Sequence, residues 1–480
     1  MRQAATTDHR PFCLFRLAGV AALLGLTACA SLQPPPSPQP ADPTPTQWTA
    51  AATSAHQPTA LAAWWARFGD PALGPLIAQA LQDQTDIAAA AARLRQARAA
   101  RDLAAAQQRP SLGGSASAQA SGSEGRATTE TYRAALDASW EADLWGAGAA
   151  GVQAAEATLQ ARGLTLAHTR ISIAAEVALN LLQLRGAQAR EAIAQDNLAS
   201  QQQTLQIVLW RFEAGLVTQL DVEQARTAVA QTEAQIPALR SSAAQAMNAL
   251  AVLTGRAPGA LHAQLQAGSD AASGPAAPPD LAVAIPAEVL RQRPDVQAAE
   301  RTLAAAEARV QQADAGRLPS LSLGGSIGLS ALSLGGLGSG AGVASLLASV
   351  SLPVLDGGRL RAQVGQQAAA RDEAAATYRA TVLAALQEVE DTLVALAAAR
   401  EQAVALQSAL ASASSAAALA EQRYRSGLVD FQNVLLSQRT RLSAQDSLAA
   451  NTTTLATTHV RLYKALGGGW TPDMPPEPAR

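Results

Sequence analysis

The chain has 480 residues, a formal net charge of -2, 15% charged residues and only 3% aromatic residues. A nearly neutral chain offers no basic surface for nucleic acid. Charged residues are scarcer than the roughly 25% usual for soluble domains, and so few aromatic residues argue against a conventional core of large side chains. The abundance of Ala, Leu, Gln and Arg instead favours long helices.

Residues 1–28 have the features of a secretion signal. Three arginines precede an apolar run at 17–26, which is too short to span a bilayer as a helix. The run ends in Leu-Thr-Ala-Cys29, which is similar to a bacterial lipobox, so we expect cleavage before Cys29 and acylation of its thiol. Ordinary signal cleavage after Ala30 is the alternative. By analogy, Ala30 directly after Cys29 favours sorting to the outer membrane.

The cysteine count supports acylation. Cys13 would leave with the signal, and Cys29 would then be the only cysteine of the mature chain. An acylated thiol explains a lone cysteine in an oxidising compartment without any disulfide. Residues 29–70 would then form the lipid anchor and an N-terminal linker.

The rest of the chain is duplicated. Residues 85–87, 109–112, 144–146 and 211–217 match 294–296, 318–321, 355–357 and 423–429 in the same order, at an offset of about 210 residues. We therefore expect two copies of one unit, at 71–255 and 285–470. A linker rich in Pro, Gly and Ala at 256–284 joins them, and a tail at 471–480 follows.

Each copy contains two segments in which apolar and polar residues alternate. They are predicted as strands at 111–121, 131–141, 320–330 and 345–354. Tyr132 and Leu136 face one way while Arg133 and Asp137 face the other, although Leu347 falls on the polar side. Alternation over this length is typical of transmembrane barrel strands. A soluble sheet with one wet face is the alternative, and 122–130 and 331–344 are the expected loops.

Long helical segments fill the remainder. They are expected at about 72–108, 146–213 and 218–254 in the first copy, and at 294–316, 358–426 and 430–466 in the second. A helix over 146–213 would be about 100 Å long, which suits a periplasm and no globular domain. Apolar and small residues in 218–254 recur at alternating spacings of three and four, as in coiled coils. Pro237 lies inside that run and predicts a kink or a break.

The helices turn at two glycine-containing segments. Gly215 ends the first long helix, and Thr218 with Asp221 forms a plausible N-cap pair for the next. In the second copy Gly427 marks the turn and Asp430 is the expected cap.

Four strands are too few to close a barrel. An open sheet would leave two unpaired edges in lipid, which the bilayer does not tolerate. Pooling strands between two subunits gives eight, whose interior side chains fill. Three subunits give twelve and leave an aqueous channel, which the polar inward faces suit.

Several motifs carry a resemblance to a known family. They are Trp64-Trp65 with 68–71, 285–296, 318–323, 352–359, 424–427 and 462–470. Together they resemble the TolC-like outer-membrane efflux proteins, in the lipoprotein branch often called NodT-type. These motifs extend over nearly all of the mature chain.

The resemblance implies an α+β membrane protein. Three protomers would share a twelve-stranded barrel, and coiled helical hairpins would form a periplasmic tunnel. It implies a lipid-anchored exit duct in the outer membrane, docked to a periplasmic adaptor and an inner-membrane pump, commonly of the RND class. Drugs or other small molecules would pass passively, since the pump supplies the energy.

Two other functions are weighed against efflux. The first is a duct for a type I protein secretion system, which the expected lipidation and the ending at 467–470 disfavour. The second is a purely structural coiled-coil lipoprotein, which the barrel strands argue against because a lipid anchor alone would suffice.

The resemblance places the closed periplasmic end and the adaptor-docking surface at the two helix turns. The candidate residues are Gly215, Leu216, Asp221, Gly427, Asp430, Leu435, Leu436 and Arg439. Several relatives carry an aspartate where this chain has Leu436, so we expect an apolar seal with Leu435 or Leu436 in the constriction. Arg439 is available for a pair with Glu223 or Asp430 of another subunit. Helix capping is the alternative role for Asp221 and Asp430.

An enzyme is not expected. His168, His262 and His459 are scattered without metal-ligand spacing. No nucleophile with a paired base is recognisable, and the glycines at 335–342 lack the strand-turn-helix setting of a phosphate loop. We therefore expect no cofactor and no metal.

Overall fold

The computed structural model describes residues 45, 48–49, 63–122, 124–125, 128–266, 274–275, 278 and 286–469. The predicted signal peptide, Cys29, the tail at 471–480 and most of the linker lie outside the described residues. Everything below concerns the described part of the chain.

The duplication is visible in matched elements. The first copy comprises α2 (Leu73–Asp83), α3 (Thr85–Gln107), β1 (Ser111–Ser121), β2 (Thr129–Ala142), α4 (Ala147–Glu213) and α5 (Gln219–Leu253). The second comprises α8 (Pro294–Ala315), β3 (Ser320–Ala331), β4 (Ala341–Ser351), α9 (Arg359–Arg425) and α10 (Phe431–Ala465). Helices α4 and α9 each have 67 residues, and α5 and α10 each have 35. The two copies therefore form the same hairpins.

Four short elements complete the described chain. They are η1 (Trp64–Phe68), α6 (His262–Gln266), α7 (Pro286–Gln292) and η2 (Leu334–Ser339).

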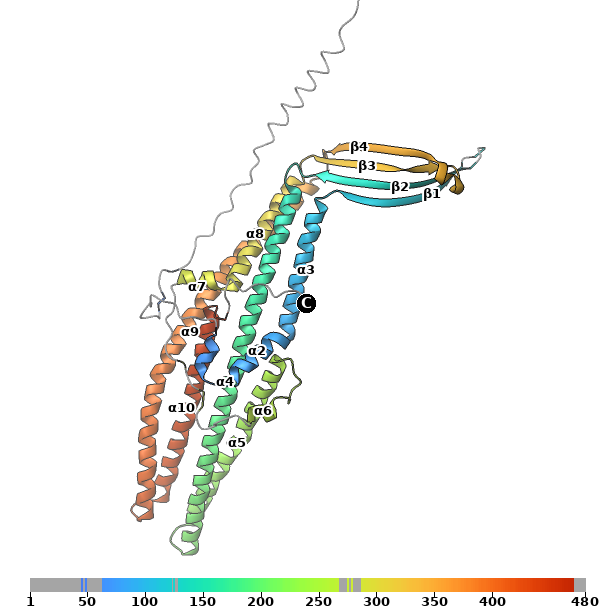
Figure 1. Cartoon of the computed structure of the whole chain (residues 1–480). Coiled ribbons are helices and arrows are strands. Elements are labelled where there is room, and N and C mark those ends of the chain that lie inside the picture. Colours follow the sequence, from blue (N-terminus) through green and yellow to red (C-terminus); the bar gives the residue numbers. More distant parts are fainter. Residues whose placement is uncertain are drawn as a thin grey trace, which may run out of the picture. The chain divides into compact units, whose positions relative to one another are not determined.

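The strands form one antiparallel sheet in the order β1-β2-β3-β4, with β1 and β4 at its edges (Figure 1). The prediction for β4 is wrong at both ends, since the strand covers 341–351 instead of 345–354. It starts early because Ala341 pairs with Ser330, although small residues hide the alternation there. It stops before Pro353, which has no N–H to donate to a ladder. The expected loop at 331–344 contains η2.

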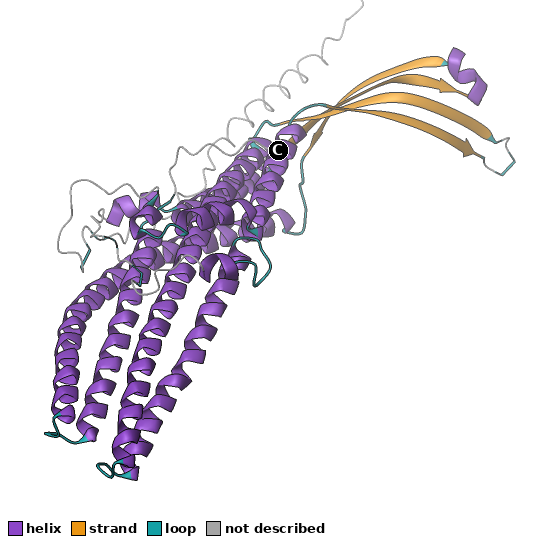
Figure 2. Cartoon of the chain, turned by 60° about the horizontal axis from the view of Figure 1, so that its bottom comes forward, coloured by secondary structure: helices purple, strands orange, loops and turns teal. Residues whose placement is uncertain are grey.

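The long helices lie side by side (Figure 2). Helix α4 packs on α5, α9 packs on α10, and α4 also packs on α10, so the two hairpins are neighbours. Nearer the sheet, α3 packs on α4, α4 on α8, and α8 on α9. Helix α9 is long and apolar enough to cross a membrane by length and composition alone. Because α9 packs on α8 and α10, we assign it to the helical layer.

Two helix predictions need correction. Of the kink or break expected at Pro237, the break is wrong because helix α5 runs through this residue, and the kink stays a prediction. The proline is exposed, so water can reach the carbonyl that it leaves unbonded. The single helix expected over 72–108 is two helices. Gln84 between them is extended, at ψ 131°, and its side chain accepts hydrogen bonds from the backbone N–H groups of Asp86 and Ile87. That side chain caps α3.

An aromatic cluster joins the beginning of the described chain to its end. The Trp64 ring stacks on Tyr463 of α10 with the ring centroids 5.1 Å apart, and Phe68 meets Tyr463 edge-on. Asp70 follows and pairs with Arg185 of α4 at 2.8 Å. This cluster lies in the largest apolar core, which also contains residues of α2, α4 and α5. Tyr463 of the motif at 462–470 therefore packs into the same core as Trp64 and Phe68 of the motif at 64–71.

Candidate functional site: a two-faced sheet and two helical tips

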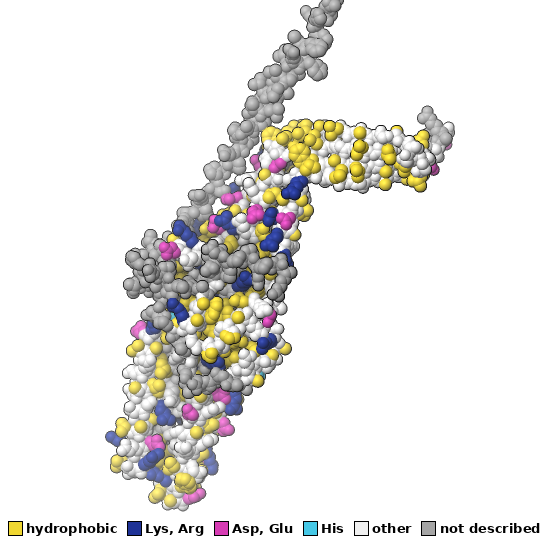
Figure 3. Space-filling model, viewed as in Figure 1, with side chains coloured by type: hydrophobic (Ala, Val, Ile, Leu, Met, Phe, Trp, Pro, Cys, Tyr) yellow, Lys and Arg dark blue, Asp and Glu magenta, His cyan; other side chains and the backbone are white. Residues whose placement is uncertain are grey.

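The register of the strands separates polar from apolar side chains over the whole sheet. Gly113, Asp137, Ser326 and Ser345 lie in one row across the four strands. The next row, on the other face, contains Gly114, Leu136, Ile327 and Ala344. On the face shown in Figure 3, most charged side chains lie over the helices instead of the strands. The sheet therefore has one polar and one apolar face, as the alternation predicts.

Hydrogen bonds link side chains across the polar face. The Ser326 hydroxyl is bonded to that of Ser345 at 2.8 Å, and Arg133 donates to Ser326 at 3.2 Å. Ser115 donates to Asp137 at 2.5 Å. The exception, Leu347, pairs with Gly324, whose missing side chain leaves room for it. These exposed polar groups suit contact with water.

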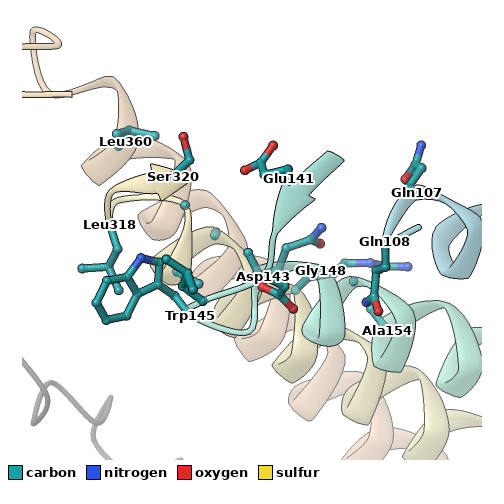
Figure 4. Close-up of a pocket in the computed structure, with 18 of the residues that line it drawn as sticks. Gln107, Gln108, Glu141, Asp143, Trp145, Gly148, Ala154, Leu318, Ser320 and Leu360 are labelled. Atoms are coloured by element: carbon teal, nitrogen blue, oxygen red, sulfur yellow. The ribbon is translucent and has the colours of Figure 1, made fainter. Parts of the chain in front are cut away.

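The junction between sheet and helices is held by two indole groups. Trp140 donates to the carbonyl of Gln108 at 2.9 Å, and Trp145 donates to the carbonyl of Pro319 at 2.6 Å. A cavity of about 780 Å³ lies there, lined by Glu141, Ser320 and several glutamines (Figure 4). Glu141 and Ser320 share the polar face, so that face continues toward the helices.

Gly215 and Gly427 end the long helices as predicted. Their φ angles are 70° and 72°, in the left-handed region that favours glycine. At the first tip, the Thr218 hydroxyl accepts from the N–H of Asp221, and the Asp221 carboxylate accepts from the N–H of Thr218. This reciprocal capping box gives Asp221 a local structural role.

The second tip differs from the prediction. Asp430 occupies the N-cap position of α10, but its side chain makes no capping hydrogen bond. Leu435 is only 7% exposed because it packs with Tyr424, Phe431 and residues of α5. Leu435 therefore cannot also line a constriction, whereas Leu436 is 66% exposed. Leu216 and Leu428 project from the two turns and are also exposed.

Arg439 contacts the other hairpin of its own chain. Its guanidinium donates to the side-chain oxygen of Gln231 in α5 at 3.2 Å. Glu223, one of its two expected partners, instead pairs with Arg226 at 2.9 Å. A pair between subunits stays a prediction.

A polar seam that sequence reasoning missed connects the two hairpins. Its members in α4 are spaced by seven residues, at Arg190, Asn197, Thr204 and Arg211. The partners across the seam are Asp446, Gln445, Gln438 and Tyr424, respectively. The Arg190–Asp446 pair is bidentate, at 2.6 and 2.9 Å. The spacing of seven residues is visible in the sequence and could have indicated this seam. Polar residues at that spacing are also typical of a helix face that is exposed to solvent.

Arg293 is the centre of a buried ionic cluster where α8 begins. It donates to Asp295 at 2.7 and 3.1 Å and to Glu388 of α9 at 2.8 Å, as well as to the carbonyl of Ala465. Burial would raise the pKa of Asp295, but the hydrogen bonds and charge of Arg293 outweigh it and lower that pKa. Burial also lowers the pKa of the nearby His168. The Arg-Pro-Asp motif therefore ties α8, α9 and the end of α10 together.

The described residues contain no group of three or more His, Cys, Asp or Glu side chains placed to hold a metal ion. The features that stand out are instead surfaces: the polar sheet face, the junction below it and the two tips.

Known proteins share this architecture. The sequence profile of the outer membrane efflux protein family matches residues 76–256 and again 285–468. The chain is 34% identical to the pyoverdine export outer membrane protein OpmQ of Pseudomonas putida, over 98% of this chain and 99% of the relative. It is 30% identical to nodulation protein T of Rhizobium leguminosarum bv. trifolii, over 90% and 92% of the two chains.

Solved structures agree. The outer-membrane channel OprN has a TM-score of 0.84 at 34% identity, over 91% of this chain and 99% of that chain. The open state of the MtrE channel of Neisseria gonorrhoeae has a TM-score of 0.81 at 27% identity, over 91% and 98% of the two chains.

Fold and surfaces together define a TolC-like channel protein of the outer membrane. The chain belongs to the outer membrane efflux protein family. It is an outer-membrane efflux channel, and the expectations of fold class, localisation and efflux function are confirmed at that level.

Proposed function

We propose that three copies of this chain form the exit duct of a tripartite pump for small molecules. The observation that carries this proposal is the open sheet with two free edges. Strands β1 and β4 run in opposite directions, so the β4 edge of one copy can continue antiparallel onto the β1 edge of the next. Three sheets pool twelve strands, and the polar faces line a channel wide enough for water.

Native mass and planar-bilayer conductance of the purified protein test this assembly. A conducting trimer is expected. A monomer that does not conduct would contradict the proposal, because a single sheet leaves both edges unpaired in lipid.

The tips are the proposed docking surface for a periplasmic adaptor, which links the duct to an inner-membrane pump of the RND class. Leu216 and Leu428 are exposed at the two turns. We expect Leu216→Glu and Leu428→Glu to abolish efflux in cells while the purified trimer still conducts. Leu103→Glu is the control, since Leu103 is also exposed, at 61% against 73% for each tip leucine, but lies in α3, away from the tips. Equal loss of efflux in all three variants would contradict docking at the tips.

Leu436 is the proposed apolar constriction. Leu436→Ser should raise the conductance of the resting trimer and leave its native mass unchanged. Leu435→Ser should instead destabilise the tip, because Leu435 is buried between the hairpins. Unchanged conductance in Leu436→Ser would show that Leu436 does not form the seal.

Cys29 is the proposed site of lipid attachment. Intact-mass spectrometry of the membrane-extracted protein should show a chain that begins at Cys29 and carries acyl groups. A Cys29→Ser chain should lack them. A mature chain that begins after Ala30 would contradict lipidation.

Efflux is favoured over protein secretion because the relatives found include the toluene efflux pump outer membrane protein TtgF and the OpmQ proteins. Drug susceptibility and secreted proteins of a deletion strain distinguish the two functions. Increased susceptibility with unchanged secretion is expected.

A further inference from the structure

The two connections at the far end of the sheet differ in charge, although the chain is duplicated. The β1–β2 connection includes Glu124 and Arg126. By contrast, no Asp, Glu, Lys, Arg or His occurs between Arg317 and Asp356, a stretch that contains β3, η2 and β4. The β3–β4 connection, 332–340, therefore carries no charged side chain, whereas the β1–β2 connection carries charges of both signs, so the two connections suit different surroundings.

Element η2 does not project from the sheet, because it folds back against the ends of β3 and β2. Two glycines permit this fold. A Cβ atom on Gly340 would lie 2.8 Å from the carbonyl oxygen of Ser330, and a Cβ atom on Gly336 would lie 3.0 Å from the Ser333 hydroxyl and 3.4 Å from the Cβ of Ala331. The loop is thus held close to the strand end.

The contact with Ala331 identifies the side of the sheet on which η2 lies. Ala331 is an even number of residues from Ile327 and Leu329 in β3 and so lies on the same face of the strand. Its partner in β2 is Tyr132. All of these belong to the apolar face. Because Gly336 lies against the Cβ of Ala331, η2 covers the end of that apolar face and not the polar one.

This position coincides with an expected membrane boundary. Strand β3 has 12 residues, and about 9 to 11 tilted residues cross the hydrocarbon layer. Tyr132 beside the loop donates from its hydroxyl to Glu130, an arrangement that suits an aromatic residue at the lipid–water interface. Leu332 and Leu334 at this level are 73% and 69% exposed.

We propose that η2 and the residue pair before it form an interfacial anchor that inserts Leu332 and Leu334 into the outer leaflet of the membrane. Its partner is the hydrocarbon boundary of that leaflet, because the loop is apolar and uncharged and continues the apolar face of the sheet. A loop without cationic side chains forms no ion pairs with lipid phosphates, so its contact with the membrane depends on its apolar side chains and the acyl chains. The inference rests on the proposed barrel.

Fluorescence quenching of the full-length protein in liposomes tests the anchor. Single cysteines are introduced by Leu334→Cys, by Leu329→Cys on the apolar face, by Ser117→Cys on the polar face and by Glu124→Cys in the other connection. Each is labelled with an environment-sensitive fluorophore, and the unmodified chain reports any labelling of Cys29. Brominated phospholipids quench labels in hydrocarbon, and iodide quenches labels in water.

The label at Leu334 should lose most of its emission to brominated lipid, as the label at Leu329 does, while the labels at Glu124 and Ser117 respond to iodide. Quenching at Leu334 by iodide alone, or by neither agent, would overturn the anchor, since the loop would then lie in water or across the mouth of the barrel. Failure of brominated lipid to quench at Leu329 would contradict the barrel itself, which separates the two outcomes.

Discussion

The guanidinium carbon of Arg211 lies 4.3 Å from the centroid of the Tyr424 ring. Arg211 lies in the last turn of α4 and Tyr424 in the last turn of α9, so this contact joins the two tips. The guanidinium also reaches the carbonyls of Tyr424 and Arg425 at 3.4 Å. The contact is the last pair of the polar seam, and Tyr424 also belongs to the apolar cluster between the hairpins.

A double-mutant cycle should detect this contact. A cation over an aromatic ring contributes about 0.5–1 kcal/mol at exposed sites. We expect Arg211→Ala and Tyr424→Leu to be less than additive by about that amount in thermal unfolding. The pair Arg226→Ala and Tyr424→Leu serves as the control, because Arg226 makes its salt bridge with Glu223 instead. Full additivity in the Arg211 cycle would contradict the coupling.

Gly186 permits the close approach of α4 and α10. A Cβ atom there would collide with the Thr453 hydroxyl and lie 2.8 Å from its methyl carbon. Gly186→Ala should therefore destabilise the protein by about 1–3 kcal/mol, despite the better helix propensity of alanine.

Denaturant unfolding measures this effect, and Thr453→Ala should partly restore the stability of Gly186→Ala. Gly163→Ala is the control, since the nearest atom to its added Cβ, on Leu94, is 3.9 Å away. A stabilised Gly186→Ala would show that the helices can move apart at no cost.

The Asp70–Arg185 ion pair should matter far more than an exposed one. Its side chains are 14% and 12% exposed, and Arg185 also bonds to Gln188. Asp70→Leu would leave a mostly buried charge unpaired, at a cost of about 3 kcal/mol. Glu223→Ala, which breaks a pair whose side chains are both 54% exposed, should cost no more than about 0.5 kcal/mol. The free energy of unfolding of both variants is measured by chemical denaturation. Comparable decreases would show that burial of the ion pair does not determine how much its loss destabilises the protein.

Stability should depend on pH through His168. Burial lowers the folded-state pKa of this histidine, so the unfolded chain binds the proton more readily. The contribution of His168 to the free energy of unfolding is fully present above its unfolded-state pKa of about 6.5. That contribution is lost as pH falls from there toward the folded-state pKa.

Unfolding free energies measured between neutral and mildly acidic pH should therefore slope downward on acidification. The slope should be shallower in His168→Gln. Asp295 affects stability at lower pH than His168 does. Because its folded-state pKa is lowered, its contribution to the free energy of unfolding is lost only as pH falls below the ordinary range of aspartate pKa values. An unchanged slope in His168→Gln would assign the pH dependence to other groups.

Much of this architecture could be predicted from sequence because its signals are local and repeated. Alternation of Tyr132, Arg133, Leu136 and Asp137 identifies a two-faced strand without knowledge of its neighbours. Gly215 and Gly427 are needed where the chain turns with positive φ. Two details were missed for different reasons. Alternation could not locate the start of β4, because pairing with the distant Ser330 extends that strand. The Gln84 cap is local, but glutamine is not among the residues that N-caps prefer, so the sequence did not indicate that its side chain caps a new helix.

The periodicities and the turns could be recognised without a structure because each depends on residues that are near in the chain, and the duplication because its motifs recur in the same order. Only the tertiary structure decided which leucine is buried and which is exposed at positions 435 and 436, since adjacent helical residues point about 100° apart and only packing selects one. It likewise decided that Arg190, Asn197, Thr204 and Arg211 face α10 or the end of α9. Their partners lie more than 200 residues away along the chain, and no local spacing specifies which helix will supply them.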